Sequence, residues 1–216
     1  MNPPYRDGER LEIGGAQVRL SVSRRARRVS LRIDRARREV VAVAPSLRRL
    51  AEAAAFARQR RAWVAERLAE LPAPRLLEAG ETLVLFGAPF PLAEVGAIKR
   101  EALAVFEARA RAHCAALGVD APRIAVTDAR TRWGSCSPAR PGRAAAIRLS
   151  WRLALAPRAV ADYVVAHECA HLLEANHGPG FWRLVRTLVG DEKPPRAWLR
   201  AHGAALHAVD PPALRG

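Results

Sequence analysis

Hydrophobic and polar positions alternate along the first part of the chain, a period of two that is typical of β-strands with one buried face. The alternating hydrophobic residues are Val18, Leu20 and Val22, followed by Val29, Leu31 and Ile33. We therefore expect strands between 11 and 44, with a hairpin turn at 35–38. From 46 to 70 the hydrophobic residues recur every three or four positions, which predicts one amphipathic helix packed on the sheet, with Ser46 as its N-cap.

Helical and strand patterns are mixed along the rest of the chain, so the predicted fold class is α+β. We predict a hairpin over 83–93, a helix over 99–117 that stops at Gly118, strands at 124–128 and 146–153, a loop at 130–142, a helix that begins at Pro157, a short helix from Pro179 to Gly190, and a last helix over 195–206. The predicted division is a basic, strand-rich subdomain with one long helix at 1–95 and a second domain at 96–216, unless the two form one continuous domain.

The strongest chemical signal is the run from His167 to His171, which reads H-E-C-A-H and lies among good helix formers, with no Gly or Pro before Gly178. Residues four apart lie about one turn apart on a helix, so the two imidazoles project the same way. Two neutral imidazoles suit Zn²⁺, and the neighbouring Glu168 suits the removal of a proton from water bound to that ion.

Two residues compete to be the third ligand of this metal. His177 is preferred, because Asn176, Gly178 and Pro179 predict a turn that brings its side chain back over the metal. Glu174 lies on nearly the same helix face as His167 but would diverge from the metal on a straight helix. It remains an alternative ligand, or a group that orients one of the histidines.

Three stretches together resemble the YgjP-like metal-dependent hydrolases, which belong with the SprT-like and related zinc metallopeptidase domains. They are YVVAHECAHLLEANHGPGFW (163–182), RWGSCS (132–137) and PRAWL (195–199). The resemblance extends from Arg24 to Leu206 and is most specific from Arg132 to Trp182. Metzincins carry Gly at the position held here by Glu174, so the chain differs from that class.

The resemblance implies a zincin-like metallopeptidase domain, in which a metal helix packs on a small mixed sheet. It implies zinc on His167, His171 and His177, with Glu168 as the catalytic glutamate that activates a zinc-bound water. It also places the 132–137 motif on the active-site side, so the candidate substrate-binding residues are Arg132, Trp133, Gly134 and Ser135. An extended substrate would pair with an edge strand beside the metal helix, and Gly134 would let another backbone approach closely.

Other residue types of the motif region fit this chemistry less well. Ser135 and Cys136 are poor candidate nucleophiles beside a metal site, and Cys169 faces away from His167 toward the core. The sequence does not single out the donor that stabilises the oxyanion; Tyr163 and Arg132 are the candidates.

The chain is strongly basic, with a net charge of +15, and 34 of its 36 basic residues are arginines. Between Arg19 and Arg67 there are 15 arginines and four acidic residues, a net charge of +11. Such a surface attracts polyanions, although a genome-wide preference for arginine has the same effect on composition. Weak nucleic-acid binding through this region, a nucleic-acid-associated protease, and hydrolysis of nucleotide phosphoanhydrides are therefore alternatives to a peptide or protein substrate.

Three cysteines without a C-x-x-C pair argue against a disulfide framework. The first residues lack the hydrophobic segment of a signal peptide, and no hydrophobic run approaches the ~18–20 residues that a membrane helix needs. We therefore expect a cytoplasmic protein that does not bind membranes.

Overall fold

The structure is a computed structural model that describes residues 4–34, 37–78, 80–93 and 95–210. It divides into two compact units, unit 1 (Met1–Ala73) and unit 2 (Pro74–Gly216). The sequence predicts this boundary at 95/96, and the structure places it earlier. The reason is the hairpin of β6 (Thr82–Leu85) and β7 (Ala88–Pro91), whose Leu83 and Leu85 are buried in the core of unit 2.

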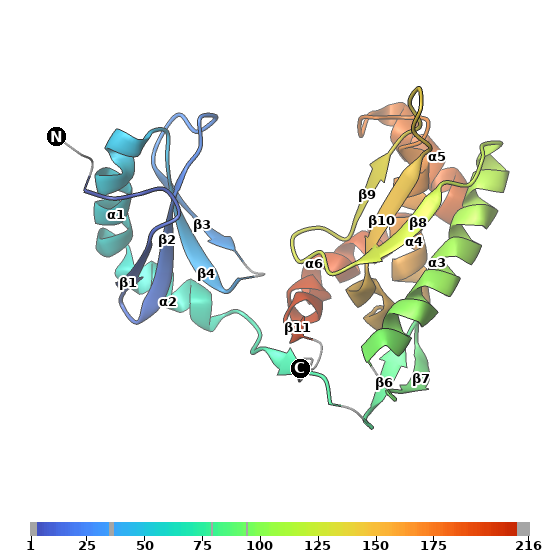
Figure 1. Ribbon diagram of the computed structural model, residues 1–216, viewed down its shortest axis with the longest axis horizontal. Coiled ribbons are helices and arrows are strands. Elements are labelled where there is room, and N and C mark those ends of the chain that lie inside the picture. The colour runs from blue at the N-terminus through green and yellow to red at the C-terminus, as the bar shows by residue number, and fades with distance from the viewer. Residues whose placement is uncertain (1–3, 35–36, 79, 94, 211–216) are drawn as a thin grey trace. The chain divides into compact units, whose positions relative to one another are not determined.

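Unit 1 is built on a four-stranded sheet (Figure 1). Its strands are β1 (Arg10–Ile13), β2 (Ala16–Val22), β3 (Ser30–Asp34) and β4 (Glu39–Ala44). The order is β1-β2-β4-β3, with β2 and β4 parallel and the other pairs antiparallel. The predicted alternation is confirmed in β2, where Val18 and Leu20 are fully buried. Of the hairpin turn expected at 35–38, positions 35 and 36 lie outside the described residues.

The helix predicted over 46–70 is interrupted. A 3-10 turn (Leu47–Arg49) leads into α1 (Leu50–Gln59), and α2 (Arg61–Ala69) follows after Arg60, whose φ of −100° and ψ of 23° leave the helical region. The break falls in the polar run 58–61, where no hydrophobic side chain holds the chain against the sheet. Ser46 precedes the turn in an extended conformation, and its side chain makes no capping hydrogen bond.

The core of unit 1 joins small helical residues to branched residues of the sheet. Ala53, Ala54 and Ala57 of α1 are fully buried and belong to the same cluster as Leu20 and Val40. An alanine extends only one carbon from the backbone, so α1 packs close to the strands. The prediction that a helix covers this sheet is confirmed.

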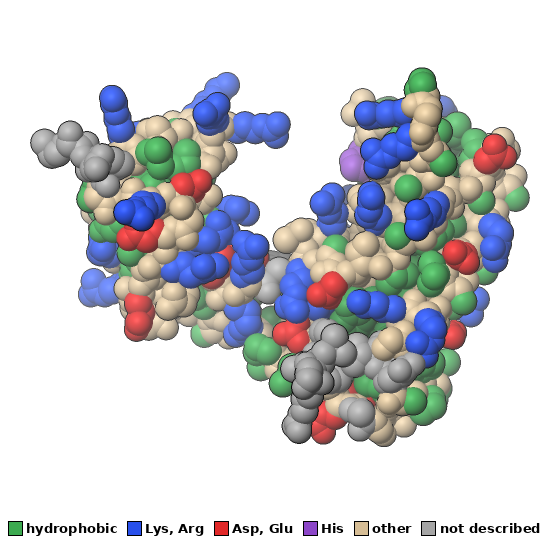
Figure 2. Space-filling model, viewed as in Figure 1, with side chains coloured by type: hydrophobic (Ala, Val, Ile, Leu, Met, Phe, Trp, Pro, Cys, Tyr) green, Lys and Arg blue, Asp and Glu red, His purple; other side chains and the backbone are tan. Residues whose placement is uncertain are grey.

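Arginine side chains cover much of the visible surface of unit 1 (Figure 2). Exposed ones before and within β3 are Arg24, Arg25, Arg27, Arg28 and Arg32. Others serve the interior: the guanidinium groups of Arg10 and Arg19 both donate hydrogen bonds to the buried carboxylate of Glu39. Some arginines of unit 1 therefore neutralise a buried carboxylate, and only the others contribute positive charge to the surface.

Unit 2 combines short strands with four helices of 11 residues or more among its described residues. Its helices are α3 (Val95–Leu117), α4 (Arg158–Ala170), α5 (Pro179–Val189) and α6 (Lys193–His207), with a 3-10 segment, η2 (Trp151–Leu155). Besides the β6–β7 hairpin, its strands are β5 (Arg75–Leu76), β8 (Arg123–Thr127), β9 (Gly134–Ser137), β10 (Ala146–Ser150) and β11 (Val209–Asp210). The predicted ends of α3 at Gly118 and of α5 at Gly190 are confirmed, and both glycines have positive φ.

The main sheet of unit 2 is mixed. Its order is β8-β10-β9, with β10 parallel to β8 and antiparallel to β9. Helices α3 and α4 lie against this sheet (Figure 1), and Ile147 and Leu149 of β10 are fully buried. The strand predicted to run to 153 ends at Ser150, because the chain turns into η2 and buries Trp151. The combination of helices with a small mixed sheet agrees with the predicted α+β fold class.

Two predictions around the motifs are corrected. The segment expected as a loop at 130–142 contains β9, a four-residue strand at one edge of the sheet. The helix that begins at Pro157 is expected from the sequence to include Glu174, but it ends at Ala170 instead. The N–H groups of Leu172 and Leu173 bond to carbonyls three residues back, a tightening that is typical of a helix end. No helix in the described residues is both long and hydrophobic enough to cross a membrane.

Candidate metal centre

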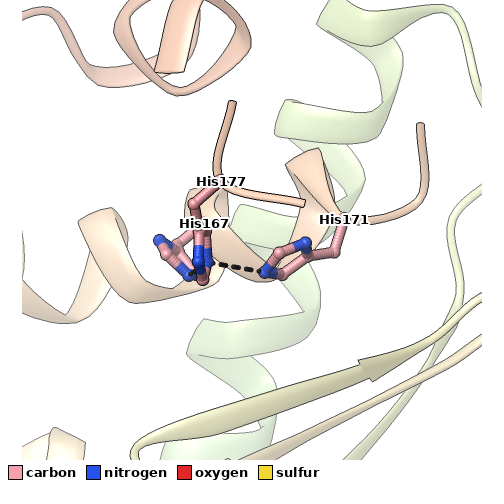
Figure 3. Close-up of side chains that lie close together, drawn as sticks. All are labelled: His167, His171 and His177. Atoms are coloured by element: carbon pink, nitrogen blue, oxygen red, sulfur yellow. Dashed lines mark hydrogen bonds between the residues drawn. The ribbon is translucent and has the colours of Figure 1, made fainter. Parts of the chain in front are cut away.

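Three histidines from the end of α4 and the turn after it converge (Figure 3). His167 lies in the last turn of α4, His171 is its C-cap residue, and His177 precedes the start of α5 at Pro179. The turn closes through a hydrogen bond from the N–H of Gly178 to the carbonyl of Asn176, 2.8 Å. The chain therefore reverses after α4 and returns His177 to the helix, as the residue types predict.

The ring nitrogens are spaced as ligands of a single small cation. The Nε2 atom of His177 lies 3.0 Å from Nε2 of His167 and 3.1 Å from Nε2 of His171. Two zinc–nitrogen bonds of ~2.0–2.1 Å at a tetrahedral angle separate their nitrogens by about 3.3 Å. The observed spacing is close to that value, so the three imidazoles fit a tetrahedral ion with one further position.

Neighbouring groups orient two of the rings. The Nδ1 of His171 lies 2.9 Å from the main-chain carbonyl oxygen of Glu174, and this carbonyl can only accept, so Nδ1 carries the proton and Nε2 is free to bind a metal. The hydroxyl of Tyr163 lies 3.5 Å from Nδ1 of His167, on the ring edge away from His177. This position suits the orientation of His167 better than the oxyanion role considered for Tyr163.

Glu174 therefore contributes to the site through its backbone. Its side chain is absent from the converging cluster, and Oε1 would lie 2.7 Å from a Cβ atom placed on Gly180, in the first turn of α5. A carboxylate at a helix N-terminus is stabilised by the helix dipole. Of the two roles that the sequence leaves open, the geometry favours orientation of a histidine.

Aromatic rings surround the three histidines. The ring centroid of Phe181 lies 4.5–4.8 Å from all three imidazoles, and Trp182 lies 5.8 Å from His177. Burial lowers the pKa of His167 to about 4, helped by the nearby His171 and His177. The ring of His167 is therefore neutral near pH 7, the form that binds metals.

Glu168 follows the first histidine and is buried against β9. Its exposed fraction is 6%, and a Cβ atom at position 134 would lie 2.6 Å from its Oε1 and 2.7 Å from its Cγ. Only glycine at position 134 leaves room for this side chain. Burial raises the pKa of the Glu168 carboxyl to about 7, while the charge of Arg132 and a hydrogen bond from the N–H of Cys136 oppose the rise. A carboxyl group with a pKa near 7 can both take and give a proton.

The edge of β9 that faces away from β10 is unpaired in the described part of the chain. The N–H of Ser150 donates to the carbonyl of Trp133, and hydrogen-bonded pairs alternate along antiparallel strands. Ser135 and Ser137 therefore bond to β10, whereas Gly134 and Cys136 direct their backbone groups to the free edge. The N–H of Cys136 that binds Glu168 lies on this edge.

The other candidate substrate-binding residues have different environments. The Trp133 ring stacks on His207 of α6, with centroids 4.0 Å apart, and Gly203 leaves room for it. Trp133 thus anchors the start of β9 to α6. Arg132 is exposed, and its charge acts on Glu168. Ser135 lies on the sheet face of Arg148, opposite to the face of Gly134 and Glu168.

Sequence reasoning places Phe181 and Trp182 only within the short helix from Pro179 to Gly190 and misses their position beside the three histidines. It also misses Arg196 of α6, whose guanidinium carbon lies 4.5 Å from the centroid of Trp182. Two adjacent aromatic residues four and five positions after His177 are the sequence signal that could have indicated these aromatic neighbours of the histidines.

The cysteines offer no competing nucleophile. Burial raises the pKa of Cys136 to about 12 and holds the pKa of Cys169 still higher. Both thiols therefore stay protonated near pH 7. Cys169 is fully buried, as its position on the helix predicts, and its sulfur lies 3.8 Å from that of Cys114.

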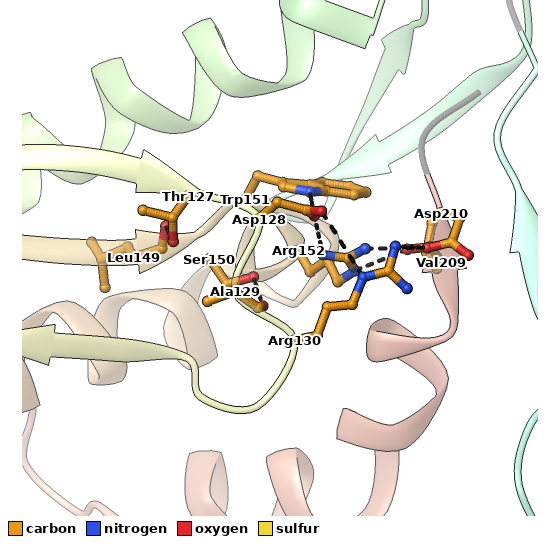
Figure 4. A network of polar contacts seen from close by, with 10 residues as sticks. All are labelled: Thr127, Asp128, Ala129, Arg130, Leu149, Ser150, Trp151, Arg152, Val209 and Asp210. Atoms are coloured by element: carbon orange, nitrogen blue, oxygen red, sulfur yellow. Dashed lines mark hydrogen bonds and ion pairs between the residues drawn. The ribbon is translucent and has the colours of Figure 1, made fainter. Parts of the chain in front are cut away.

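A network of polar contacts connects the segment after β8, the segment η2 after β10 and the C-terminal strand β11 (Figure 4). At its centre is Arg152 of η2, whose side chain is fully buried. It donates to the Val209 carbonyl at 2.8 Å and to the carboxylates of Asp128 and Asp210, and its guanidinium lies over the ring of Trp151. The network ties the end of β8 and the segment that leads to β9 to the C-terminal strand β11.

A family model described as YgjP-like, metallopeptidase domain, matches residues 95–202. The match contains α4, β9 and the three histidines, and it covers half of the 216 residues. It is shorter than the stretch from Arg24 to Leu206 over which the motifs suggested a resemblance, and it includes no residue of unit 1. No curated protein and no solved structure gives a significant match.

The geometry predicts which residues a metal needs. After incubation with Zn²⁺ and gel filtration, we expect one zinc ion per chain in the wild type and in Glu174→Ala, and loss of most of it in His177→Ala. The reason is that His177 supplies a ligand atom, whereas the Glu174 side chain only faces Gly180. Elemental analysis by mass spectrometry measures the metal. Retention in His177→Ala with loss in Glu174→Ala would indicate a His-His-Glu site instead.

The network predicts a stability difference between two arginines. Arg152→Met leaves the Val209 carbonyl and two carboxylates without their buried partner, so we expect unit 2 to lose about 3 kcal/mol of unfolding free energy. Arg130→Met removes a side chain that is 35% exposed, and we expect a loss of less than about 1 kcal/mol. Urea unfolding followed by tryptophan fluorescence reports mainly on unit 2, which holds four of the five tryptophans. Equal losses would contradict the central role of Arg152.

Proposed function

The chain belongs to the YgjP-like family of metallopeptidase domains, and from that premise we propose that it is a zinc-dependent peptidase whose catalytic base is Glu168. The observation that carries the proposal is the joint geometry of four side chains. Three imidazole nitrogens converge, and the carboxylate one residue after the first of them is buried beside an edge of β9 that no strand pairs with in the described part of the chain.

Zinc is the proposed ion because three neutral imidazoles at near-tetrahedral spacing, with one position left open, are typical of catalytic zinc sites. When bound, the ion would supply Lewis acidity, which polarises a carbonyl group and lowers the pKa of water. The protein's part is to hold His167, His171 and His177 in the ligating orientation. The Glu174 carbonyl and the ring of Phe181, which packs against the imidazoles, support this orientation.

Glu168 is the proposed proton carrier. Its carboxylate takes a proton from the water that attacks the substrate carbonyl and then gives this proton to the leaving nitrogen. Its burial and the opposing hydrogen bond from Cys136 leave a pKa from which both transfers are feasible near pH 7. The contact with Gly134 limits the positions that this carboxylate can adopt.

The substrate is proposed to be an extended peptide segment that adds to the free edge of β9. The Gly134 N–H and carbonyl, together with the Cys136 carbonyl, are the backbone groups available for pairing, because Glu168 occupies the Cys136 N–H. Pairing of this kind aligns a peptide backbone without regard to most side chains. Arg132, exposed next to this edge in sequence, is proposed to contact the bound substrate.

The strand edge is also what favours peptides over nucleotides. A nucleotide has no backbone amides that could pair with Gly134. The strand edge therefore supports a peptide substrate and gives no support to the nucleotide hydrolase considered from the sequence. That alternative and the nucleic-acid-associated protease remain predictions.

Replacement of the base gives a direct test. We expect Glu168→Gln to retain zinc and to lower kcat/KM on a quenched fluorescent casein by about 10²–10⁴-fold, since the amide cannot accept the proton. Zinc content is measured on the same preparation. Undiminished cleavage by Glu168→Gln would overturn the assignment of the base, and release of phosphate from nucleoside triphosphates without cleavage of casein would favour the nucleotide alternative.

The contact between Gly134 and Glu168 predicts a second effect. Gly134→Ala introduces a methyl group where the carboxylate lies, so we expect unchanged zinc content and a decrease of about 10²-fold in kcat, the cost of displacing a catalytic group by about 1 Å. Ser135→Ala is the matched control, because its side chain lies on the opposite face of β9, and its kcat should stay close to that of the wild type. If both variants behave alike, the close approach has no catalytic role.

A further inference from the structure

Unit 1 has a groove that is lined by none of the residues of the candidate metal centre. It holds about 340 Å³ and is lined by residues 28–31 on one side and by Phe56, Arg60 and Trp63 on the other. The first side is the start of β3 and the residues before it, and the second is the junction of α1 and α2. The groove therefore runs between a strand and a helical segment of the same unit.

The strand that borders the groove is an edge strand. β3 pairs with β4 on one side and is the last strand in the order β1-β2-β4-β3. Within the described residues no strand pairs with its other side. An unpaired edge presents a row of N–H and carbonyl groups, to which an extended segment of another chain can add as a further strand.

The lining of the groove is mostly hydrophobic. Val29 and Leu31 are two residues apart and share one face of the strand, and Phe56 and Trp63 are seven residues apart, two helical turns. All four side chains are only partly buried, and Val29, Leu31 and Trp63 pack against the core of unit 1. Together they form shallow hydrophobic pockets, which can accept the side chains of every second residue of an added strand.

Two arginines border this hydrophobic lining. Arg28 and Arg60 are both exposed, and the guanidinium carbon of Arg60 lies 5.7 Å from the centroid of Phe56. No carboxylate in the described part of the chain pairs with either residue. The groove therefore combines a hydrophobic lining with unneutralised positive charge at its rim, which complements a ligand that is both acidic and hydrophobic.

We propose that this groove binds an extended, acidic segment of another polypeptide, which pairs with the edge of β3 and places hydrophobic side chains against Val29, Leu31, Phe56 and Trp63. β3 has five residues, so it can pair with a segment of similar length. A nucleic-acid strand fits the groove less well. The guanidinium of Arg60 covers Phe56, and half-buried Trp63 offers limited area for a stacked base.

The proposal does not depend on the peptidase activity. The groove lies in unit 1, outside residues 95–202, and binding can be measured in a chain that does not turn over substrate. The zinc-loaded, full-length Glu168→Gln protein serves as the background for every measurement, so that a labelled peptide stays intact. Failure of binding would leave the metal centre untouched, and failure of catalysis would leave the groove untouched.

The probe is a fluorescein-labelled nonapeptide in which glutamate alternates with valine, leucine and phenylalanine, and binding is followed by fluorescence anisotropy. Two further versions carry N-methyl groups on alternate residues, one along each edge of the extended peptide. We expect the unmodified peptide and one N-methylated version to bind, and the other version to bind at least about tenfold more weakly, because it loses its hydrogen bonds to β3. Equal binding of both methylated versions would overturn pairing with the strand.

Charge reversal tests the place of binding. Arg28→Glu combined with Arg60→Glu should weaken the peptide at least about fivefold, by loss of two favourable charges and gain of two unfavourable ones. Arg24→Glu combined with Arg48→Glu changes the net charge equally at exposed positions that do not line the groove, and should weaken it less than twofold. Equal losses in both pairs, or tighter binding of a fluorescein-labelled oligothymidylate that competes with the peptide, would overturn the proposal.

Discussion

The catalytic half of the molecule depends on a close approach between a carboxylate and a strand backbone. The side chain of Glu168 is buried against Gly134, and its carboxylate accepts a hydrogen bond from the N–H of Cys136, two residues after Gly134. This approach sets the distance between α4 and the edge of the sheet, and it requires both the mixed β8-β10-β9 order and the absence of a side chain at position 134. Trp133, stacked on His207 of α6, anchors the start of β9, and the network around Arg152 ties the segment before β9 to the C-terminal strand β11.

The local part of the site could be predicted from the sequence because its signals are local. Residues four apart on a helix project together, and Asn176 to Pro179 favour a turn, so the positions of His167, His171 and His177 relative to one another follow from short-range rules. The glycines at the ends of α3 and α5 belong to the same class of signal.

The partners across the sheet could not be predicted in this way. That Gly134 to Ser137 form a strand depends on pairing with residues 146–149 of β10, and the intervening segment has the composition of a loop. The division at 73/74 depends on where the side chains of a short hairpin are buried, which neither charge nor composition reveals. The break at Arg60 similarly depends on the sheet beneath the helix, which holds the chain on both sides of a polar run.

The turn between α4 and α5 has a thermodynamic consequence for the metal. Of the three histidines that could hold a metal, two belong to α4 and its C-cap, but His177 is held by a turn closed by one short-range hydrogen bond between Gly178 and Asn176. Because a bound metal would hold the turn in place, ordering of the turn reduces the net free energy of metal binding. The metal affinity and the local stability of the turn are therefore thermodynamically linked. By the same linkage, a substitution that stiffens the turn without touching any ligand raises affinity, and the ion in return protects the junction of the two helices from local unfolding.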